Sequence, residues 1–233
     1  MSSDVVYVWL VRTDLPAEVL AGLAALLDDT ERQRAAALLT ASDARRFVAA
    51  HGACRVVLGD HLGVPPEGVR WLRDRHGKPE LAGPLSQVHV SVSHAGTISA
   101  LALTGSRRVG VDVQQSLASL DVTRMAARYY PPTEARLVAA ARQPVQQVSR
   151  FLRLWARKEA CVKVTGGRLM EGLRLPAHGP SPVVVHAPGQ ALPGPYLVRD
   201  LAVPPGFYGA LALEGTSSYV VKRRWWPAAP PPD

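Results

Sequence analysis

The first part of the chain combines one apolar run with two helical patterns. The apolar run over residues 5–11 predicts a buried strand. The pattern over residues 16–27 predicts a helix that has proline in its first turn. Ser42 is placed to cap a longer helix over residues 43–62, and Gly63 is placed to end it.

The middle of the chain has a pattern that is typical of a sheet. Apolar and polar residues alternate over residues 88–93, which predicts a half-buried strand. Apolar runs over residues 98–103 and 109–113 predict further strands of the sheet, and residues 69–72 predict a short one. The sequence RHGKP at residues 75–79 predicts a turn.

The second half returns to helices and then ends in short strands. Helical patterns cover residues 123–130, 132–141 and 149–164. The remainder, rich in proline and glycine, alternates short strands as far as Val221, and residues 227–233 are expected to be disordered. Because helices and strands alternate in both halves, we predict the α/β (α+β) class.

Composition indicates a folded protein without a disulfide framework. Of the 233 residues, 47% are apolar and 20% are charged, which argues against global disorder. Two cysteines exclude a disulfide scaffold and a Cys-rich zinc module. The first residues lack the pattern of a signal peptide, and no apolar stretch has the length of a membrane span. We therefore expect a soluble, cytoplasmic protein.

The charge of the chain is unevenly placed. The formal net charge is +8, and residues 124–174 alone hold eleven bases and three acids, whereas residues 1–31 carry a net charge of −5. This balance favours an anionic partner, although a basic solvated surface is the simpler interpretation. Most of the bases are arginine, so each of the few lysines is a candidate for a site that needs a compact ammonium group. The four lysines are Lys78, Lys158, Lys163 and Lys222.

An acidic residue in the strand over residues 109–113 is a candidate ligand. Asp112 shares one face of this strand with Gly110, which leaves room beside the carboxylate for a ligand or an ion. The simpler interpretation is a surface aspartate on an edge strand. The chain contains none of the sequence motifs of P-loops, Rossmann folds, zinc proteases or serine hydrolases.

The helix predicted over residues 149–164 carries a second set of candidates. Glu159 and Lys163 are four residues apart and so share a face, where Glu159 could bind a hard cation and Lys163 a phosphate oxygen. The alternative is an ordinary surface pair worth about 0.3–0.5 kcal/mol. Lys158 falls within the apolar stripe, where a lysine is costly unless it reaches solvent or meets an anion.

Two further segments could donate hydrogen bonds to an anion. Ser93 and His94 end a predicted strand just before a glycine-containing turn, and Lys78 lies in the turn Gly-Lys-Pro. The alternatives are a structural histidine at a strand end and a plain surface turn.

These segments occur in a fixed order: GKP at 77–79, SVSHAG at 91–96, GVDVQ at 110–114 and WARKEACVK at 155–163. Their combination resembles the 4′-phosphopantetheinyl transferase superfamily, most of all its monomeric surfactin-synthetase-activating type. The resemblance covers residues 5–215, and the last block is its most specific part.

The resemblance implies an enzyme that moves the 4′-phosphopantetheine arm of coenzyme A onto a serine of an acyl or peptidyl carrier protein. The by-product is adenosine 3′,5′-bisphosphate. It also implies two similar α/β halves packed as a pseudo-dimer, with coenzyme A and Mg²⁺ in the cleft between them. We place the halves at residues 1–108 and 109–215, followed by a C-terminal extension over 216–233. The expected partners are acidic carrier proteins and coenzyme A, with no nucleic acid and no membrane, and the expected state is a monomer.

The resemblance assigns a role to each candidate residue. Asp112 and Glu159 match the metal ligands of the family, and together with Lys163 they form the catalytic set. The residues that match coenzyme A contacts are Arg46, Lys78, Ser93, His94 and Lys163, with Arg34 as a possible addition. One departure is Gln114, where the bacterial pattern GxDxE has a carboxylate that binds Mg²⁺ more strongly than an amide.

Two rival functions remain open at this point. A basic nucleic-acid-binding protein fits the net charge, but aromatic residues are only 6% and no recognition motif is present. A coenzyme A-binding protein that has lost catalysis fits the departure at Gln114. The sequence does not indicate whether the carrier serves fatty-acid, polyketide or nonribosomal-peptide synthesis.

Overall fold

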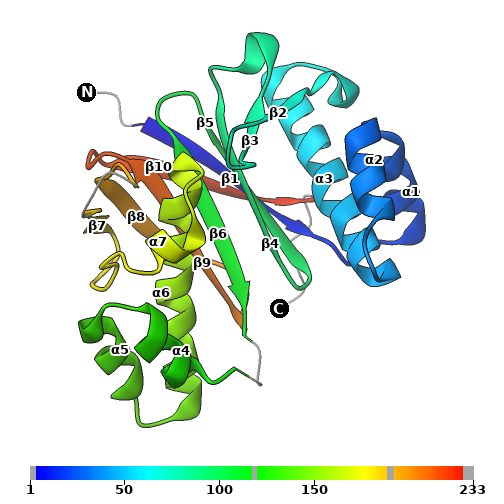
Figure 1. The fold of residues 1–233 in the computed structure, drawn as a ribbon. Helices are drawn as coiled ribbons and strands as arrows, with labels where there is room; N and C mark the ends of the chain where they lie inside the picture. The colour runs from blue at the N-terminus through cyan, green and yellow to red at the C-terminus, as the bar shows by residue number, and fades with distance from the viewer. Residues whose placement is uncertain (1–3, 117–119, 188–191, 228–233) are drawn as a thin grey trace.

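The computed structural model describes residues 4–116, 120–187 and 192–227 of the chain. Helices and strands are mixed throughout, which confirms the predicted α/β (α+β) class. Figure 1 shows two groups of helices on either side of two central sheets. Among the helices of these residues, none is long and apolar enough to cross a membrane. Disorder was expected over residues 227–233; Pro227 is described, and residues 228–233 lie outside the described part.

The first sheet has the strand order β10-β1-β5-β4. Strands β1 (Asp4–Arg12), β5 (Ile98–Thr104) and β4 (His89–Ala95) pair antiparallel in this order. Val90 faces α3, whereas Ser91 and Ser93 face the second sheet, which accounts for the alternation seen in the sequence.

The last strand of the chain completes this first sheet. Strand β10 (Tyr219–Trp226) pairs in parallel with β1, so that part of the predicted C-terminal extension is built into the N-terminal half. The strand also continues beyond Val221, where the prediction ended it. Val221 and Trp225 alternate onto the core between the sheets, and their burial stabilises the added length.

The N-terminal helices cover the outer face of the first sheet. They are α1 (Ala17–Ala25), α2 (Asp29–Ala36) and α3 (Ala41–Leu62). The hydropathy pattern did not predict α2, although Asp28 and Glu31 form a reciprocal capping box at its start.

The predicted cap of α3 was wrong by two residues. Thr40, not Ser42, caps the helix, because its Oγ1 accepts the backbone N–H of Asp43 at 3.0 Å. Gly63 ends the helix in the left-handed conformation, as predicted. A short hairpin of β2 (Trp71–Arg73) and β3 (Pro79–Leu81) then follows, after the 3-10 turn Pro66–Gly68.

The second sheet has the order β6-β9-β8-β7 and is antiparallel. Its strands are β6 (Val109–Gln115), β7 (Val183–Val185), β8 (Tyr196–Leu201) and β9 (Phe207–Glu214). The helices of this half are α4 (Val122–Tyr129), α5 (Pro132–Ala139), α6 (Pro144–Thr165) and α7 (Leu169–Gly172). Helix α6 begins at Pro144 and not at residue 149, since proline suits the first turn.

The two halves share one apolar core. Val8 and Ala100 of the first sheet belong to the same buried cluster as Val111 and Leu211 of the second. The four-stranded sheet of each half therefore packs against the sheet of the other half. A 22-residue helix covers the outer face of each sheet, α3 in the first half and α6 in the second. Helix α6 lies on β6 and β9 (Figure 1).

Candidate active site

A glycine on β6 sets how closely helix α6 approaches the second sheet. A Cβ on Gly110 would lie 2.0 Å from the Ala160 carbonyl oxygen and 2.7 Å from the Val164 nitrogen. The space that we expected beside Asp112 at this glycine is therefore filled by the backbone of α6. This close approach brings the side chains of α6 to the carboxylate of Asp112.

Asp112 is buried, with 1% of its surface exposed, and accepts three hydrogen bonds. Lys163 Nζ lies 2.6 Å from its Oδ1, and Ser93 Oγ donates to the same oxygen at 2.8 Å. Gln114 Nε2 donates to Oδ2 at 2.8 Å. A desolvated carboxylate is stable only with such partners, so its surroundings are matched to a negative charge.

Glu159 is the second carboxylate of the site. Trp155 Nε1 donates to its Oε1 at 2.5 Å, and Lys163 Nζ lies 3.9 Å from its Oε2. Burial, followed by repulsion from Asp112, raises the pKa of Glu159 to about 7. The two neighbouring carboxylates therefore repel each other when both are ionised, and a bound cation would reduce this repulsion.

These two carboxylates fit a magnesium ion that also binds a substrate phosphate. Mg²⁺ is usually held by one or two carboxylates, with water and phosphate oxygens as its other ligands. In the described part of the chain, no group of three or more His, Cys, Asp or Glu side chains is placed to hold a metal. Asp112 and Glu159 would thus leave most positions to water and phosphate oxygens. Gln114 faces Asp112 through its amide nitrogen.

Two cavities lie in the first half and share one lining residue, His94, which follows Ser93 in the chain. A cavity of about 260 Å³ is lined by Arg34, His51, Arg73 and His94, among others. A second cavity, of about 270 Å³, is lined by Arg46 and again by His94. His94 therefore lies where the two cavities meet. Cationic side chains line both cavities, together with the carboxylates of Asp28, Glu31 and Asp43.

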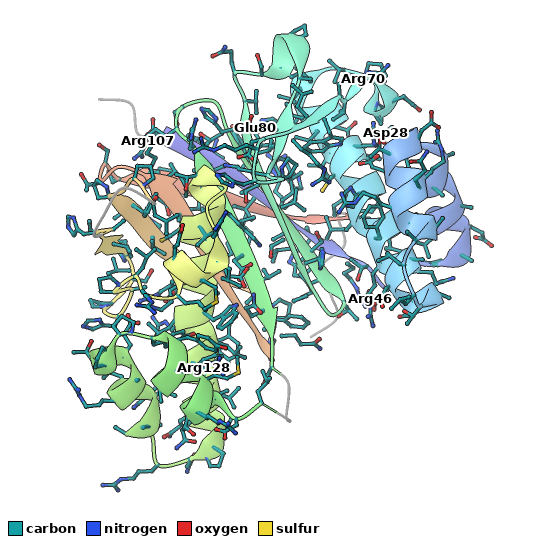
Figure 2. All side chains as sticks on the ribbon, viewed as in Figure 1. Asp28, Arg46, Arg70, Glu80, Arg107 and Arg128 are labelled. Carbon is teal, nitrogen blue, oxygen red and sulfur yellow. The ribbon has the colours of Figure 1, made fainter. Side chains whose placement is uncertain are left out.

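Arg46 is exposed near the start of α3, and its Nη1 lies 3.3 Å from Asp43 Oδ1. Figure 2 shows it beside the tip of the β4–β5 hairpin. Arg34 lies on α2, with its guanidinium 5.3 Å from the centre of the Phe47 ring. Both arginines can reach an anion in the cavities without leaving a buried partner unpaired.

Lys78 occupies a different position. Its Nζ donates to the carbonyl oxygens of Val164 at 2.6 Å and of Val109 at 3.4 Å, so it ties the β2–β3 hairpin to the end of α6 and the start of β6. Burial lowers the pKa of Lys78 to about 8. A cation at the carboxyl end of a helix is also favoured by the helix dipole.

Lys158 meets an anion of the protein itself. Its Nζ lies 2.5 Å from Glu134 Oε2, both side chains are fully buried, and it also donates to the Leu175 carbonyl oxygen. Its unusual place in the apolar stripe of α6 therefore has a structural explanation. The ammonium contacts the core of the second half and not the face that carries Glu159.

The structure thus brings together four of the residues singled out in the sequence: Ser93, Asp112, Glu159 and Lys163. His94 and Arg46 line adjoining cavities, whereas Lys78 is bound to backbone. Sequence reasoning missed the contact that Trp155 makes with Glu159. The spacing of four residues between Trp155 and Glu159 on one helix could have indicated this contact, as the same spacing did for Glu159 and Lys163.

Comparison with known proteins supplies an independent line of argument. The family model of the 4′-phosphopantetheinyl transferase superfamily matches residues 108–183, which include Asp112, Glu159 and Lys163. The chain is 32% identical, over 70% of its own length and 70% of the other's, to the 4′-phosphopantetheinyl transferase HetI of Nostoc sp..

Two other bacterial relatives are of the same kind. A putative 4′-phosphopantetheinyl transferase of Synechocystis sp. is 29% identical over 71% of this chain and 67% of its own. A 4′-phosphopantetheinyl transferase of Bacillus subtilis is 30% identical over 57% of this chain and 59% of its own. The chain therefore belongs to the 4′-phosphopantetheinyl transferase superfamily.

Proposed function

We propose that the chain transfers 4′-phosphopantetheine from coenzyme A to a serine of a carrier protein and releases adenosine 3′,5′-bisphosphate. The observation that carries this proposal is the cluster of Asp112, Glu159 and Lys163, which Ser93 joins through hydrogen bonds. The next residue, His94, lines two cavities that also hold cationic side chains. This combination of carboxylates and cationic side chains matches a substrate that carries a pyrophosphate and a 3′-phosphate. The names of the relatives support the same activity.

We further propose that Asp112 and Glu159 hold Mg²⁺. When bound, this ion would neutralise charge on the pyrophosphate and orient it for displacement. Lys163 adds a fixed positive charge beside both carboxylates. Its ammonium group would stabilise the negative charge that develops on adenosine 3′,5′-bisphosphate as the P–O bond of the pyrophosphate breaks.

The carrier serine must lose a proton as its oxygen attacks the phosphorus on the pantetheine side. Glu159 is the side chain best suited to take this proton, because its Oε1 is held by Trp155 while its Oε2 lies at the longer distance of 3.9 Å from Lys163. The serine oxygen then forms the new phosphoester bond, and adenosine 3′,5′-bisphosphate leaves.

Binding of coenzyme A involves the two cavities of the first half. Arg46 would pair with the 3′-phosphate, Arg34 would assist it, and His94 would contact phosphate where the cavities meet. The resemblance also assigns Lys78 and Ser93 to phosphate. Both of these side chains already have protein partners, Lys78 the carbonyl oxygens of Val164 and Val109 and Ser93 the carboxylate of Asp112.

The basic segment over residues 124–174 would attract the acidic carrier protein. Eight of its eleven bases are exposed, and Figure 2 shows Arg128 on α4, in the second half. The three others, Arg157, Lys158 and Lys163, point into the core or the site. We propose a cytoplasmic monomer in which residues 1–108 and 109–215 form the two halves, with the extension from 216 attached to the first through β10.

The experiment that tests this function is a mass measurement on a carrier protein. An apo acyl or peptidyl carrier protein is incubated with the chain, coenzyme A and MgCl₂, and its mass is expected to rise by one phosphopantetheine group. Asp112→Ala should abolish the gain and keep the fold. Near-normal turnover of this variant would contradict the assignment of Asp112.

A panel of carriers from fatty-acid, polyketide and nonribosomal-peptide systems identifies the preferred partner. Binding of coenzyme A without a mass gain on any carrier would support a catalytically impaired protein. Binding of DNA with a steep salt dependence, and none of coenzyme A, would support a nucleic-acid-binding protein.

A further inference from the structure

Two serine side chains connect the stacked sheets along their edge strands β4 and β6. Ser91 Oγ accepts the backbone N–H of Val111 at 3.0 Å, and Ser93 Oγ accepts that of Val113 at 3.2 Å. Both serines are buried, with 3% and 5% of their surfaces exposed. The hydroxyl groups thereby satisfy N–H groups of β6 that the neighbouring sheet does not pair through its backbone.

Ser93 makes two contacts that Ser91 does not make. Its hydroxyl donates to Asp112 Oδ1 at 2.8 Å, and Lys163 Nζ donates to Ser93 Oγ at 2.8 Å. A serine hydroxyl has one hydrogen to donate and two lone pairs to accept. In Ser93 all three are in use, by Asp112, Val113 and Lys163, so no hydrogen is left for a phosphate oxygen.

We propose that Ser93 is a positioning residue that holds the carboxylate of Asp112 across the joint between the two halves, in place of the phosphate contact that the family resemblance implies. The proposal rests on the proposed function only in taking Asp112 as a metal ligand. Without the hydroxyl, Oδ1 keeps only Lys163 as a partner on this side, and the carboxylate is free to turn toward the ammonium group.

The effect on metal binding follows from the position of the lost contact. Hydrogen bonds that orient a metal-binding side chain typically change metal affinity by about 10- to 100-fold when they are removed. Ser93→Ala should therefore weaken divalent metal binding by roughly this factor. The affinity for coenzyme A in the absence of metal should stay unchanged, because Ser93 offers no hydrogen to phosphate.

Ser91→Ala is the matched control. It removes the same kind of bond, from a backbone N–H of β6 to a buried serine of β4, two residues away and without any contact to Asp112. Ser93→Ala should lose more stability in urea unfolding than Ser91→Ala, because it also removes the bond to the buried carboxylate of Asp112. Only Ser93→Ala should weaken Mn²⁺ binding, measured by calorimetry with Mn²⁺ in place of Mg²⁺ and coenzyme A present.

Three results decide the proposal. Equal Mn²⁺ affinity in Ser93→Ala and Ser91→Ala would overturn it. So would weaker metal-free binding of coenzyme A by Ser93→Ala with unchanged Mn²⁺ affinity, since that result identifies a phosphate contact. A wild-type chain that binds neither Mn²⁺ nor coenzyme A would instead overturn the proposed function, and this inference with it.

A second variant tests the proposal if Ser93→Ala folds poorly. Ser93→Cys keeps the size of the side chain and a weak S–H donor, and it should give an Mn²⁺ affinity between those of the wild type and the alanine variant. A cysteine variant with wild-type coenzyme A binding but no change in Mn²⁺ affinity, relative to Ser91→Ala, would contradict the positioning role.

Discussion

Trp155 Nε1 donates a hydrogen bond to Glu159 Oε1 at 2.5 Å, one turn apart on α6. The indole ring also packs against Phe151, with ring centres 5.5 Å apart, so its orientation is set by the core of the second half. This relationship explains why the motif pairs tryptophan with glutamate at a spacing of four residues. A neutral donor on one side and Lys163 on the other hold the Glu159 carboxylate toward Asp112.

Trp155→Phe tests this relationship. The variant keeps an aromatic ring but loses the donor to a charged carboxylate, a bond worth about 1.5–3 kcal/mol. We expect the turnover number at saturating coenzyme A to fall by about 10- to 100-fold. The measurement is the rate of mass gain on a carrier protein.

Phe151→Leu serves as the control for packing at Trp155. Phe151 lies one turn earlier on α6 and is buried in the same core. Phe151→Leu should lower the free energy of unfolding but reduce the turnover number less than Trp155→Phe does, because the Nε1–H donor to Glu159 is still present. A Trp155→Phe variant with normal turnover would show that the hydrogen bond does not orient Glu159 for the reaction.

Gly110→Ala should damage the packing between β6 and α6. The added Cβ would lie 2.0 Å from the Ala160 carbonyl oxygen, a backbone atom that cannot move without shifting the helix. Overpacking of this kind typically costs about 1–3 kcal/mol, and a backbone clash places this variant at the upper end. Urea unfolding measures the loss.

Gly105→Ala is the matched control for this prediction, because a Cβ on Gly105 meets nothing within 4 Å. It should change the free energy of unfolding by less than about 1 kcal/mol. If both alanine variants had the same stability, the close approach of α6 to Gly110 would be contradicted.

The sequence pattern predicted most of the elements but not what each glycine or lysine does. Alternation and helical spacing indicated β4, β6 and α6, and the motifs indicated Asp112 and Glu159, because these features depend on local order along the chain. The interpretation of Gly110 as open space was wrong, because it requires knowing that α6 crosses β6 at that residue.

Contacts between distant segments account for the other differences. Strand β10 joins β1 from the opposite end of the chain, and nothing in its own sequence specifies that partner. Lys158 reaches Glu134 on another helix, so its burial could be noticed from the stripe but not explained. The short helix α2 was missed although its capping box was visible in the sequence.

Arg46→Ala should remove the preference for the 3′-phosphate of coenzyme A. A charge-assisted bond to phosphate is worth about 1.5–3 kcal/mol, so affinity for coenzyme A should fall about 10- to 100-fold. Affinity for dephospho-coenzyme A, which lacks this phosphate, should hardly change. Calorimetry with both ligands measures the difference.

The control for Arg46 is its exposed neighbour on α3, Arg45, which does not line the second cavity. Arg45→Ala should keep the preference for coenzyme A over dephospho-coenzyme A. Equal losses for the two ligands in Arg46→Ala would mean that this arginine binds some other part of coenzyme A.

Lys158→Met should be strongly destabilising. It leaves the carboxylate of Glu134 buried without its cation, and loss of one partner of a buried pair typically costs about 3–5 kcal/mol. Adding Glu134→Gln should recover part of this loss, since glutamine is neutral and its oxygen can still accept the Ala177 N–H. Urea unfolding compares the single and double variants.

The same variants show whether Lys158 binds a ligand. The folded double variant should bind coenzyme A as the wild type does, because the ammonium group contacts only the core of the second half. A large loss of coenzyme A affinity in this variant would assign Lys158 to the ligand, and a single variant as stable as the wild type would contradict the buried pair.

Lys78 should give the stability of the protein a dependence on alkaline pH. Burial lowers its pKa to about 8 in the folded chain, from an ordinary value of 10.5. Between these two values the unfolded chain binds the proton more strongly than the folded chain does, so this group makes stability rise with pH over that window. Below about pH 8 both states are protonated and the contribution is constant.

Lys78→Met removes this contribution, and the comparison is made by urea unfolding of wild type and variant from pH 7 to pH 10.5. The difference in free energy of unfolding, wild type minus variant, should be flat up to about pH 8 and then rise. Lys222→Met, which replaces an exposed lysine of β10, should show no such rise. A flat difference for Lys78→Met would mean that its ammonium group is solvated and not held against the carbonyl oxygens of Val164 and Val109.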